Sequence, residues 1–199
     1  IESIEEYLPS LHKYYGLRKK ALKKDKQYMW DVSINLEKEF DQKYPYEKAR
    51  ELITEGLKPL GEDYIEVLNR GFDDRWVDVY PREGKAGGAY SWGSFDTDPY
   101  ILMNYTDTLD SMFTLAHEFG HSMHSYYSKS DNDYLYAQYK IFVAEVASTF
   151  NELTLLDYLL KNVKNKNEKI YILNYYINMF IGTVFRQTMF AEFEKNTHL

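Results

Sequence analysis

The sequence has no cysteine among its 199 residues, which excludes disulfide bonds and thiolate metal ligands. Disulfides are rare in reducing compartments, so this absence is compatible with one, and we expect a cytoplasmic protein. No apolar run approaches the about 20 residues that a membrane-spanning helix needs. No secretory signal is recognisable either. We therefore expect no membrane partner.

The sequence also has fewer basic than acidic residues. The chain has 24 Lys and Arg against 31 Asp and Glu, a net charge of −7, so nucleic acid and anionic membranes are poor partners. Its 44% hydrophobic and 28% charged residues are ordinary for a soluble domain. The length allows one domain with a hydrophobic core. Because Ile1 starts inside a helical pattern and Leu199 directly follows another, we expect residues 1–199 to be a single domain, part of a longer protein.

The motif His117-Glu-Phe-Gly-His121 stands out from the rest of the chain. Residues four apart lie on the same face of a helix, so both imidazole rings can reach one metal ion. Zinc accepts neutral imidazole nitrogen at about 2.0–2.1 Å. Glu118 is offset by one residue, so its carboxylate can lie near the metal and accept a proton from water without ligating. The pattern is typical of zinc peptidases; the alternative is a solvated helix that carries two histidines by chance.

The surrounding residues favour a buried helix. Asp107 or Thr108 can cap its N-terminus, and Asp110 suits the positive end of the helix dipole. Between Asp110 and Lys129 the only acid is Glu118, and the only basic residues are histidines. A helix this apolar is expected to be buried, and buried ionisable groups need partners or a metal.

A third zinc ligand is expected downstream, with water at the open fourth position. Glu145 is the only ionisable residue between Lys140 and Glu152, inside the apolar run 141–150. An unpaired buried carboxylate is costly, and a metal removes that cost. Glu152 lies two turns further on the same face, where it can hold a ligand histidine through its other ring nitrogen. Alternatively, Glu152 simply ends the buried face.

His124 is a weaker candidate. It follows His117 by seven residues, about 10 Å along a helix, which is too far for both to bind one tetrahedral ion. We expect His124 to be a packing or outer-shell residue beside a single zinc ion.

These motifs together resemble the M3 family of zinc metallopeptidases, and within it the oligoendopeptidase F branch. The likeness is carried by residues 117–121 with His124 and by 142–152, with further support from 87–94, 99–105 and 185–193. It implies a zinc-dependent endopeptidase that cleaves oligopeptides, and a catalytic domain longer than this chain. It also implies that tyrosine or histidine residues stabilising the oxyanion lie beyond Leu199 in the family.

The predicted fold is α+β and predominantly helical, with a small antiparallel or mixed sheet packed beside a zincin-type pair of helices, one bearing the HExxH motif and the other Glu145. Hydrophobic periodicity predicts helices, and runs rich in β-branched and aromatic residues predict strands. Helices are expected at 1–24, 46–57, 61–72, 108–127, 134–161 and 168–195; strands at 28–36, 74–80, 89–95 and 100–105, the last two paired across 96–99.

An exposed edge of this sheet would let an extended peptide bind as an added strand. Gly88, Ala89, Tyr90 and Gly93 are the expected substrate-binding residues, because glycines allow close backbone approach. The alternative is that these glycines only shape a hairpin. Two other functions stay open: a zinc-stabilised module that binds peptides without cleaving them, and a metal hydrolase for another amide or ester. An intact Glu118 favours peptide hydrolysis over a structural site.

Overall fold

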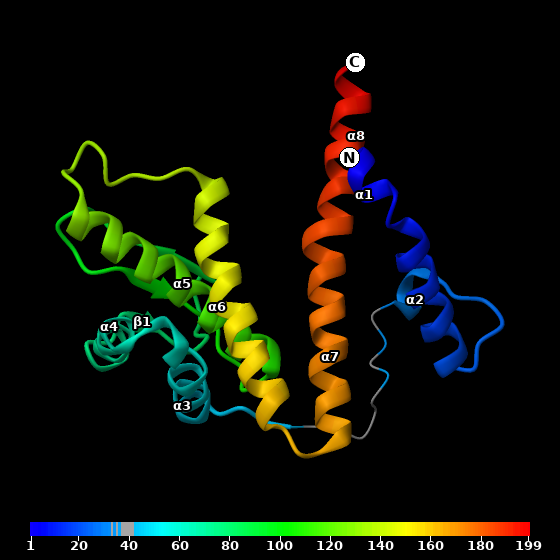
Figure 1. Cartoon of the computed structure of the whole chain (residues 1–199), viewed down its shortest axis with the longest axis horizontal. Coiled ribbons are helices and arrows are strands. Elements are labelled where there is room, and N and C mark those ends of the chain that lie inside the picture. Colours follow the sequence, from blue (N-terminus) through cyan, green and yellow to red (C-terminus); the bar gives the residue numbers. More distant parts are fainter. Residues whose placement is uncertain (33, 35, 37–41) are drawn as a thin grey trace. The chain divides into compact units, whose positions relative to one another are not determined.

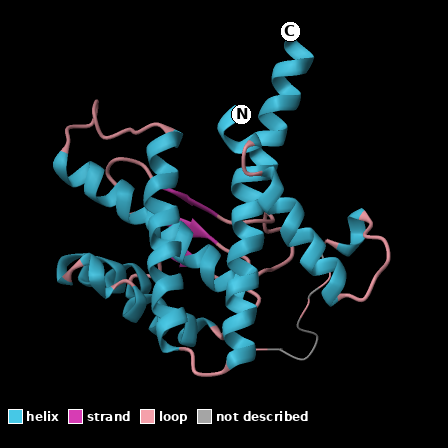
Figure 2. Ribbon diagram, turned by 45° about the vertical axis from the view of Figure 1, so that its right-hand side comes forward, coloured by secondary structure: helices cyan, strands magenta, loops and turns pink. Residues whose placement is uncertain are grey.

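The computed structural model describes residues 1–32, 34, 36 and 42–199, which form two compact units. Unit 1 comprises Ile1–Asp41 and Asn165–Leu199, and unit 2 comprises Gln42–Lys164. Helices dominate both, and the strands are short (Figure 2). The prediction of a mainly helical α+β fold is confirmed. The expectation of a single domain stays a prediction.

Unit 2 contains a small mixed sheet. Its strands are β1 (Val77–Asp78), β2 (Tyr90–Trp92) and β3 (Tyr100–Leu102), in the order β1-β3-β2. β2 and β3 are antiparallel with Ser91 opposite Ile101, which confirms the predicted hairpin, whereas β1 and β3 are parallel. Ile101 is buried and the Ser91 hydroxyl contacts that of Ser122, so this face of the sheet packs on a helix. The strand order places β2 at an edge of the sheet.

That helix, α5 (Leu109–Asp131), lies at the centre of unit 2 and packs against α6 (Ile141–Asn162) (Figure 1). Two shorter helices, α3 (Tyr46–Gly56) and α4 (Glu62–Asp73), with the 3₁₀ turn η2 (Lys58–Leu60) between them, complete the unit. All the predicted helices of this region exist. The core is apolar and includes Ile53, Leu57, Leu68, Phe72, Ile101, Met103, Leu109, Met112, Phe113, Leu115, Phe119, Met123, Leu155 and Leu159.

Helix α5 begins where the sequence predicted. Thr108 is the N-cap and its hydroxyl accepts a hydrogen bond from the Ser111 backbone N–H at 3.1 Å, while Asp110 lies in the first turn. Helix α6 starts later than predicted, at Ile141 instead of 134. Residues 132–140 are not helical; the Ala137 carbonyl and the Tyr139 hydroxyl bond to the side chains of Ser128 and Ser125 on α5.

Unit 1 starts with α1 (Glu2–Glu5), α2 (Leu8–Ala21) and the 3₁₀ turn η1 (Met29–Asp31). The strand predicted at 28–36 is wrong within its described residues; 33 and 35 lie outside them. The Asp31 carboxylate accepts a bond from the Tyr28 N–H, and buried Arg18 donates to the carbonyl oxygens of Val32 and Ile34. Backbone groups that a sheet would need are therefore bonded to side chains.

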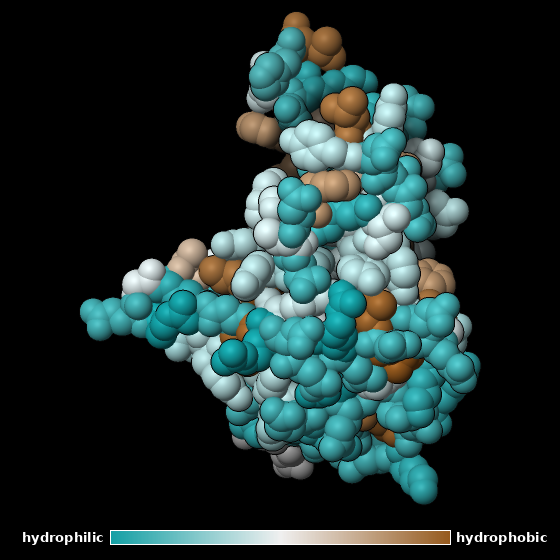
Figure 3. Space-filling view, turned by 90° about the vertical axis from the view of Figure 1, so that its left-hand side faces the viewer, coloured by the Kyte–Doolittle hydropathy of each residue, from teal (hydrophilic) through white to brown (hydrophobic). Residues whose placement is uncertain are grey.

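The C-terminal part of unit 1 is helical over the predicted range. It consists of α7 (Lys166–Phe180), the π-helical stretch η3 (Ile181–Phe185) and α8 (Arg186–His198). The Tyr14 hydroxyl of α2 donates to Asn174 of α7 at 2.8 Å. The face shown in Figure 3 is largely hydrophilic, with hydrophobic side chains in small separate patches. None of the described helices is both long and apolar enough to cross a bilayer.

Candidate metal centre

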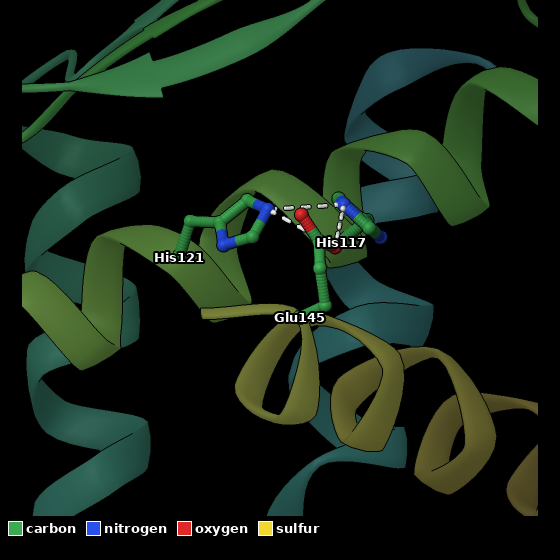
Figure 4. Close-up of side chains that lie close together, drawn as sticks. All are labelled: His117, His121 and Glu145. Atoms are coloured by element: carbon green, nitrogen blue, oxygen red, sulfur yellow. Dashed lines mark hydrogen bonds and ion pairs between the residues drawn. The ribbon is translucent and has the colours of Figure 1, made fainter. Parts of the chain in front are cut away.

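Three side chains converge where α5 meets α6. His117 and His121 come from α5 and Glu145 from α6, and their ligand atoms all lie within 4.8 Å of one another (Figure 4). His117 Nε2 is 3.1 Å from His121 Nε2 and 3.4 Å from Glu145 Oε2. Glu145 Oε2 is 3.7 Å from His121 Nε2. A tetrahedral zinc with bonds of about 2.0–2.1 Å separates its ligand atoms by about 3.3–3.4 Å, so the three residues fit such an ion.

The orientation of the His117 ring depends on α6. Its Nδ1 makes a short hydrogen bond to Oε1 of Glu152, a buried carboxylate two turns beyond Glu145. This bond leaves Nε2 of His117 directed toward His121 and Glu145. The role in which Glu152 holds a histidine through its other ring nitrogen requires this hydrogen bond, and it stays a prediction.

Asn151, the residue before Glu152, was missed by the sequence reasoning. Its side-chain Nδ2 donates to the Ala116 carbonyl at 3.1 Å, and its Oδ1 accepts from the Tyr64 hydroxyl at 2.9 Å. Asn151 is buried, so this polar contact ties α6 to α5 at the turn that carries His117. An asparagine between the apolar Phe150 and the acidic Glu152 was the available signal.

The two helices approach most closely at Gly120, inside the histidine motif. A Cβ atom there would lie 2.6 Å from Ser148 Cα and 2.9 Å from the Ala147 carbonyl oxygen, both backbone atoms of α6. Only glycine therefore allows this crossing, which sets the distance between the histidines and Glu145. A glycine in a helical pattern can indicate such close packing.

Glu118 lies beside the three converging residues but is not one of them. It is 6% exposed and lines a cleft beside the cluster, which is described below. Its Oε2 has no hydrogen-bond partner within the described part of the chain. A buried carboxylate oxygen without a partner is costly unless a substrate or water occupies the site. Its position thus suits a group that exchanges protons with a bound molecule.

The charges of the site shift its pKa values in different directions. Burial raises the pKa of Glu118, helped by the negative charges of Glu145 and Glu152, although His117 and the Ser91 N–H oppose this. Burial alone would lower the pKa of His117, but the hydrogen bond and charge of Glu152 outweigh it. Burial and the neighbouring His117 lower the pKa of His121, which favours the neutral imidazole that a metal requires.

The premise used to select Glu145 was wrong, although Glu145 lies in the cluster. We expected residues 141–150 to be buried, yet Phe142 is 83% exposed and the Glu145 side chain is 46% exposed. Only one side of α6, which includes Ala144 and Ser148, faces α5. The apolar run therefore reflects a helix whose hydrophobic face is not buried against α5.

His124 lies outside the metal cluster. Its ring stacks on Tyr139, with centroids 3.7 Å apart and planes inclined by 12°, and its buried Nδ1 has no hydrogen-bond partner in the described residues. Tyr139 in turn bonds to Ser125 through its hydroxyl. His124 thus helps to attach the segment before α6 to α5, a packing role that fits one of the two expectations.

A cleft of about 570 Å³ opens beside the cluster. Of the expected substrate-binding residues, Ala89, Tyr90 and Gly93 line it. Gly88 is not among the lining residues; its φ of 82° shapes the loop, and its carbonyl accepts a bond from Asn104. At Gly93, a Cβ would lie 3.2 Å from Asp98 O, so this glycine serves the hairpin.

Ser91 is a cleft residue that the sequence reasoning missed. Its backbone N–H interacts with the Glu118 carboxylate, and its hydroxyl lies 2.8 Å from that of Ser122 on α5. These contacts hold β2 against the helix beside Glu118. Strand alternation was the available signal, because Ser91 is the small polar residue between exposed Tyr90 and Trp92.

Comparison with known proteins assigns a family to this geometry. The model of peptidase family M3 matches residues 1–199. The chain is 50% identical over 198 residues to oligopeptidase PepF of Bacillus subtilis, covering 100% of this chain and 30% of that protein. It is 44% identical to a chromosomal oligoendopeptidase F of Lactococcus lactis subsp. cremoris, covering 100% and 33%. The chain thus spans about a third of the length of these curated relatives.

Solved structures agree with the sequence comparison. A crystal structure from Chlamydophila abortus matches with a TM-score of 0.85 and 41% identity, covering 99% of this chain and 33% of that one. The oligoendopeptidase-F of Enterococcus faecium matches with a TM-score of 0.64 and 35% identity, covering 99% and 27%.

Proposed function

Because this chain belongs to peptidase family M3, we propose that it forms the zinc-binding part of an endopeptidase that cleaves internal bonds of short peptides. The observation that carries the proposal is the convergence of His117, His121 and Glu145 at distances that suit a tetrahedral zinc, with Glu118 beside them. Relatives named oligopeptidase and oligoendopeptidase F support the substrate class.

In this proposal, His117, His121 and Glu145 hold one zinc ion. When bound, zinc lowers the pKa of a water molecule and polarises the carbonyl of the peptide. Glu118 takes the proton from that water and passes it to the departing amine. Glu118 lines the cleft, and its Oε2 has no hydrogen-bond partner among the described residues, which suits it to do so. Glu152 keeps Nε2 of His117 free for the metal by bonding to Nδ1.

The peptide is proposed to bind in extended form along β2. Because β2 is an edge strand that lines the cleft, its side away from β3 can pair with a peptide main chain, apart from the Ser91 N–H, which interacts with Glu118. Main-chain pairing requires an unfolded segment and imposes little sequence preference. Short unstructured peptides are therefore the proposed substrates. A cytoplasmic location belongs to the proposal and rests on the absence of cysteine.

The test is the variant Glu118→Gln in the full-length protein. The amide cannot accept a proton, so cleavage of a quenched fluorescent peptide should fall by about 10²- to 10⁴-fold while zinc content stays unchanged. Glu66→Gln, at an exposed position on α4, is the matched control and should cleave as the wild type does.

Two results would contradict the proposal. Parallel loss of zinc and activity in Glu118→Gln would make Glu118 a metal ligand or a structural residue. Absence of cleavage by the zinc-loaded wild-type protein, with every peptide tried, would favour a module that binds peptides without cleaving them.

A further inference from the structure

The cleft beside the metal centre has a floor and two walls. Helix α5 forms the floor from His117 to Lys129. One wall is the hairpin segment Ala89–Phe95, which includes β2, and the other is formed by Tyr134 and residues 137–139 and continues into the first turns of α6. The metal ligands lie toward the start of this floor, and Lys129 lies near the end of α5.

The two walls meet at the Lys129 end. The Phe95 and Tyr134 rings are in edge-to-face contact with centroids 5.4 Å apart. Beneath them, Lys129 Nζ donates to the Ser94 carbonyl at 3.0 Å and also to the Thr97 carbonyl. The hairpin is thereby tied both to the floor and to the opposite wall, so the two walls are joined across this end of the cleft.

The wall before α6 is held in place by side-chain contacts with α5. Ser128 Oγ donates to the Ala137 carbonyl at 2.8 Å. Tyr139 stacks on His124 and bonds to Ser125. Opening the end by moving this wall would break all three contacts. The Lys129 end of the cleft is therefore a barrier to an extended peptide.

We propose that Phe95 and Tyr134 determine specificity by limiting how many residues a substrate can extend on the amino side of the cleaved bond. The inference rests on the proposed peptidase function. From His121 to Lys129 the helix advances about 12 Å at about 1.5 Å per residue. An extended peptide covers that length in about four residues.

The direction follows from the strand. β2 runs from Tyr90 toward Phe95, and antiparallel pairing is more stable per residue than parallel pairing. A peptide added antiparallel to β2 has its amino end at the C-terminal end of that strand. The end at which the walls are joined therefore faces the amino side of the substrate, and the carboxyl side extends in the other direction.

Two peptide series test this on the full-length, zinc-loaded protein. Both keep one cleavage sequence; one series lengthens only the amino side from two to eight residues, and the other lengthens only the carboxyl side. We expect kcat/KM to fall by at least about tenfold once the amino side exceeds about four residues, with no such step in the carboxyl series. A step in the carboxyl series, or no step in either, overturns the inference while the proposed function stands. Absence of cleavage in both series overturns the proposed function and this inference with it.

The variant Tyr134→Ala tests whether the Phe95–Tyr134 contact causes the fall in kcat/KM with amino-side length. Tyr134 is 67% exposed on a loop, so its removal should open the end without unfolding the protein. The ratio of kcat/KM for an eight-residue to a four-residue amino side should rise by about tenfold or more. Tyr136→Ala, 74% exposed in the same loop but outside the cleft lining, should leave that ratio at the wild-type value. An unchanged ratio in Tyr134→Ala, or an equal rise in both variants, contradicts the assignment.

Discussion

Helix α5 keeps Phe113 and Phe119 at 1% and 0% exposure, whereas on α6 Phe142 is 83% exposed and Phe150 is 56% exposed. Both helices contribute residues to the candidate metal centre. One is positioned by burial on several sides, because the sheet, α3, α4 and α6 all pack against it. The other presents an apolar face that nothing within unit 2 covers to the same extent.

Because α6 is less buried than α5, specific contacts with α5 have to position Glu145. On α6 the contacts that matter are a close backbone crossing at Gly120 and Ser148, the Asn151 bond to Ala116, and the Glu152 bond to His117. Hydrophobic burial is non-directional, whereas these contacts each define a distance. We therefore infer that α5 supplies a stable platform and that a few specific contacts set the position of Glu145, the proposed third ligand.

The largest expected effect comes from comparing two phenylalanines. Phe119→Ala should lower the free energy of unfolding by about 3–5 kcal/mol, because it leaves a cavity beneath the motif where Phe72 contacts the ring. Phe142→Ala, on the exposed face of α6, should change it by less than about 0.5 kcal/mol. Denaturant unfolding of both variants would measure this. Equal losses would show that α6 is covered in the folded protein and would break the comparison.

A second test addresses the helix crossing. Gly120→Ala places a Cβ against the backbone of α6, so the helices must separate; we expect a loss of about 1–3 kcal/mol in unfolding free energy and weaker zinc binding. Gly16→Ala in α2 is the control, because no described atom beyond its own helix backbone and chain neighbours lies within 4 Å of the added Cβ. There alanine should gain up to about 1 kcal/mol. Normal zinc affinity in Gly120→Ala would contradict the role of the crossing.

The smallest expected effect concerns Glu152. Glu152→Gln keeps an acceptor near His117 Nδ1 but removes the charge, and we expect zinc affinity to fall by about 10-fold, the lower end of the about 10- to 100-fold typical for such partners. Competition with a chromophoric chelator would measure it. Asp157→Asn, an exposed position on the same helix, should bind zinc like the wild type. Unchanged affinity in Glu152→Gln would mean that Glu152 only ends the buried face.

Local features of the site were readable without the structure. The spacing of His117 and His121 places both rings on one helix face, because residues four apart are always neighbours on a helix. Thr108 could be identified as a cap for a similar reason, since capping joins residues two or three apart. The mainly helical fold and the β2–β3 hairpin likewise follow from short-range patterns.

Features that join distant segments were decided only by the tertiary structure. Arg18 bonds to the carbonyl groups of 32 and 34 and so replaces the predicted strand with a turn. Tyr139 and Ala137 bond the segment before α6 to α5, and α6 starts only after that segment. Neither set of contacts can be predicted from hydrophobic periodicity. The side chains involved are polar or aromatic, and their partners are backbone groups or side chains of a distant segment.

The metal centre shows both kinds of information in one place. The sequence by itself determined that His117 and His121 share a helix face with Glu118 beside them, because all three lie within about one helical turn. It also pointed to Glu145 and Glu152, but it assumed that burial explained the former and left the role of the latter open. Only the crossing of α5 and α6 at Gly120 decided that Glu145 faces the histidines and that Glu152 meets Nδ1 of His117, because the relative position of two helices depends on packing that no local spacing encodes.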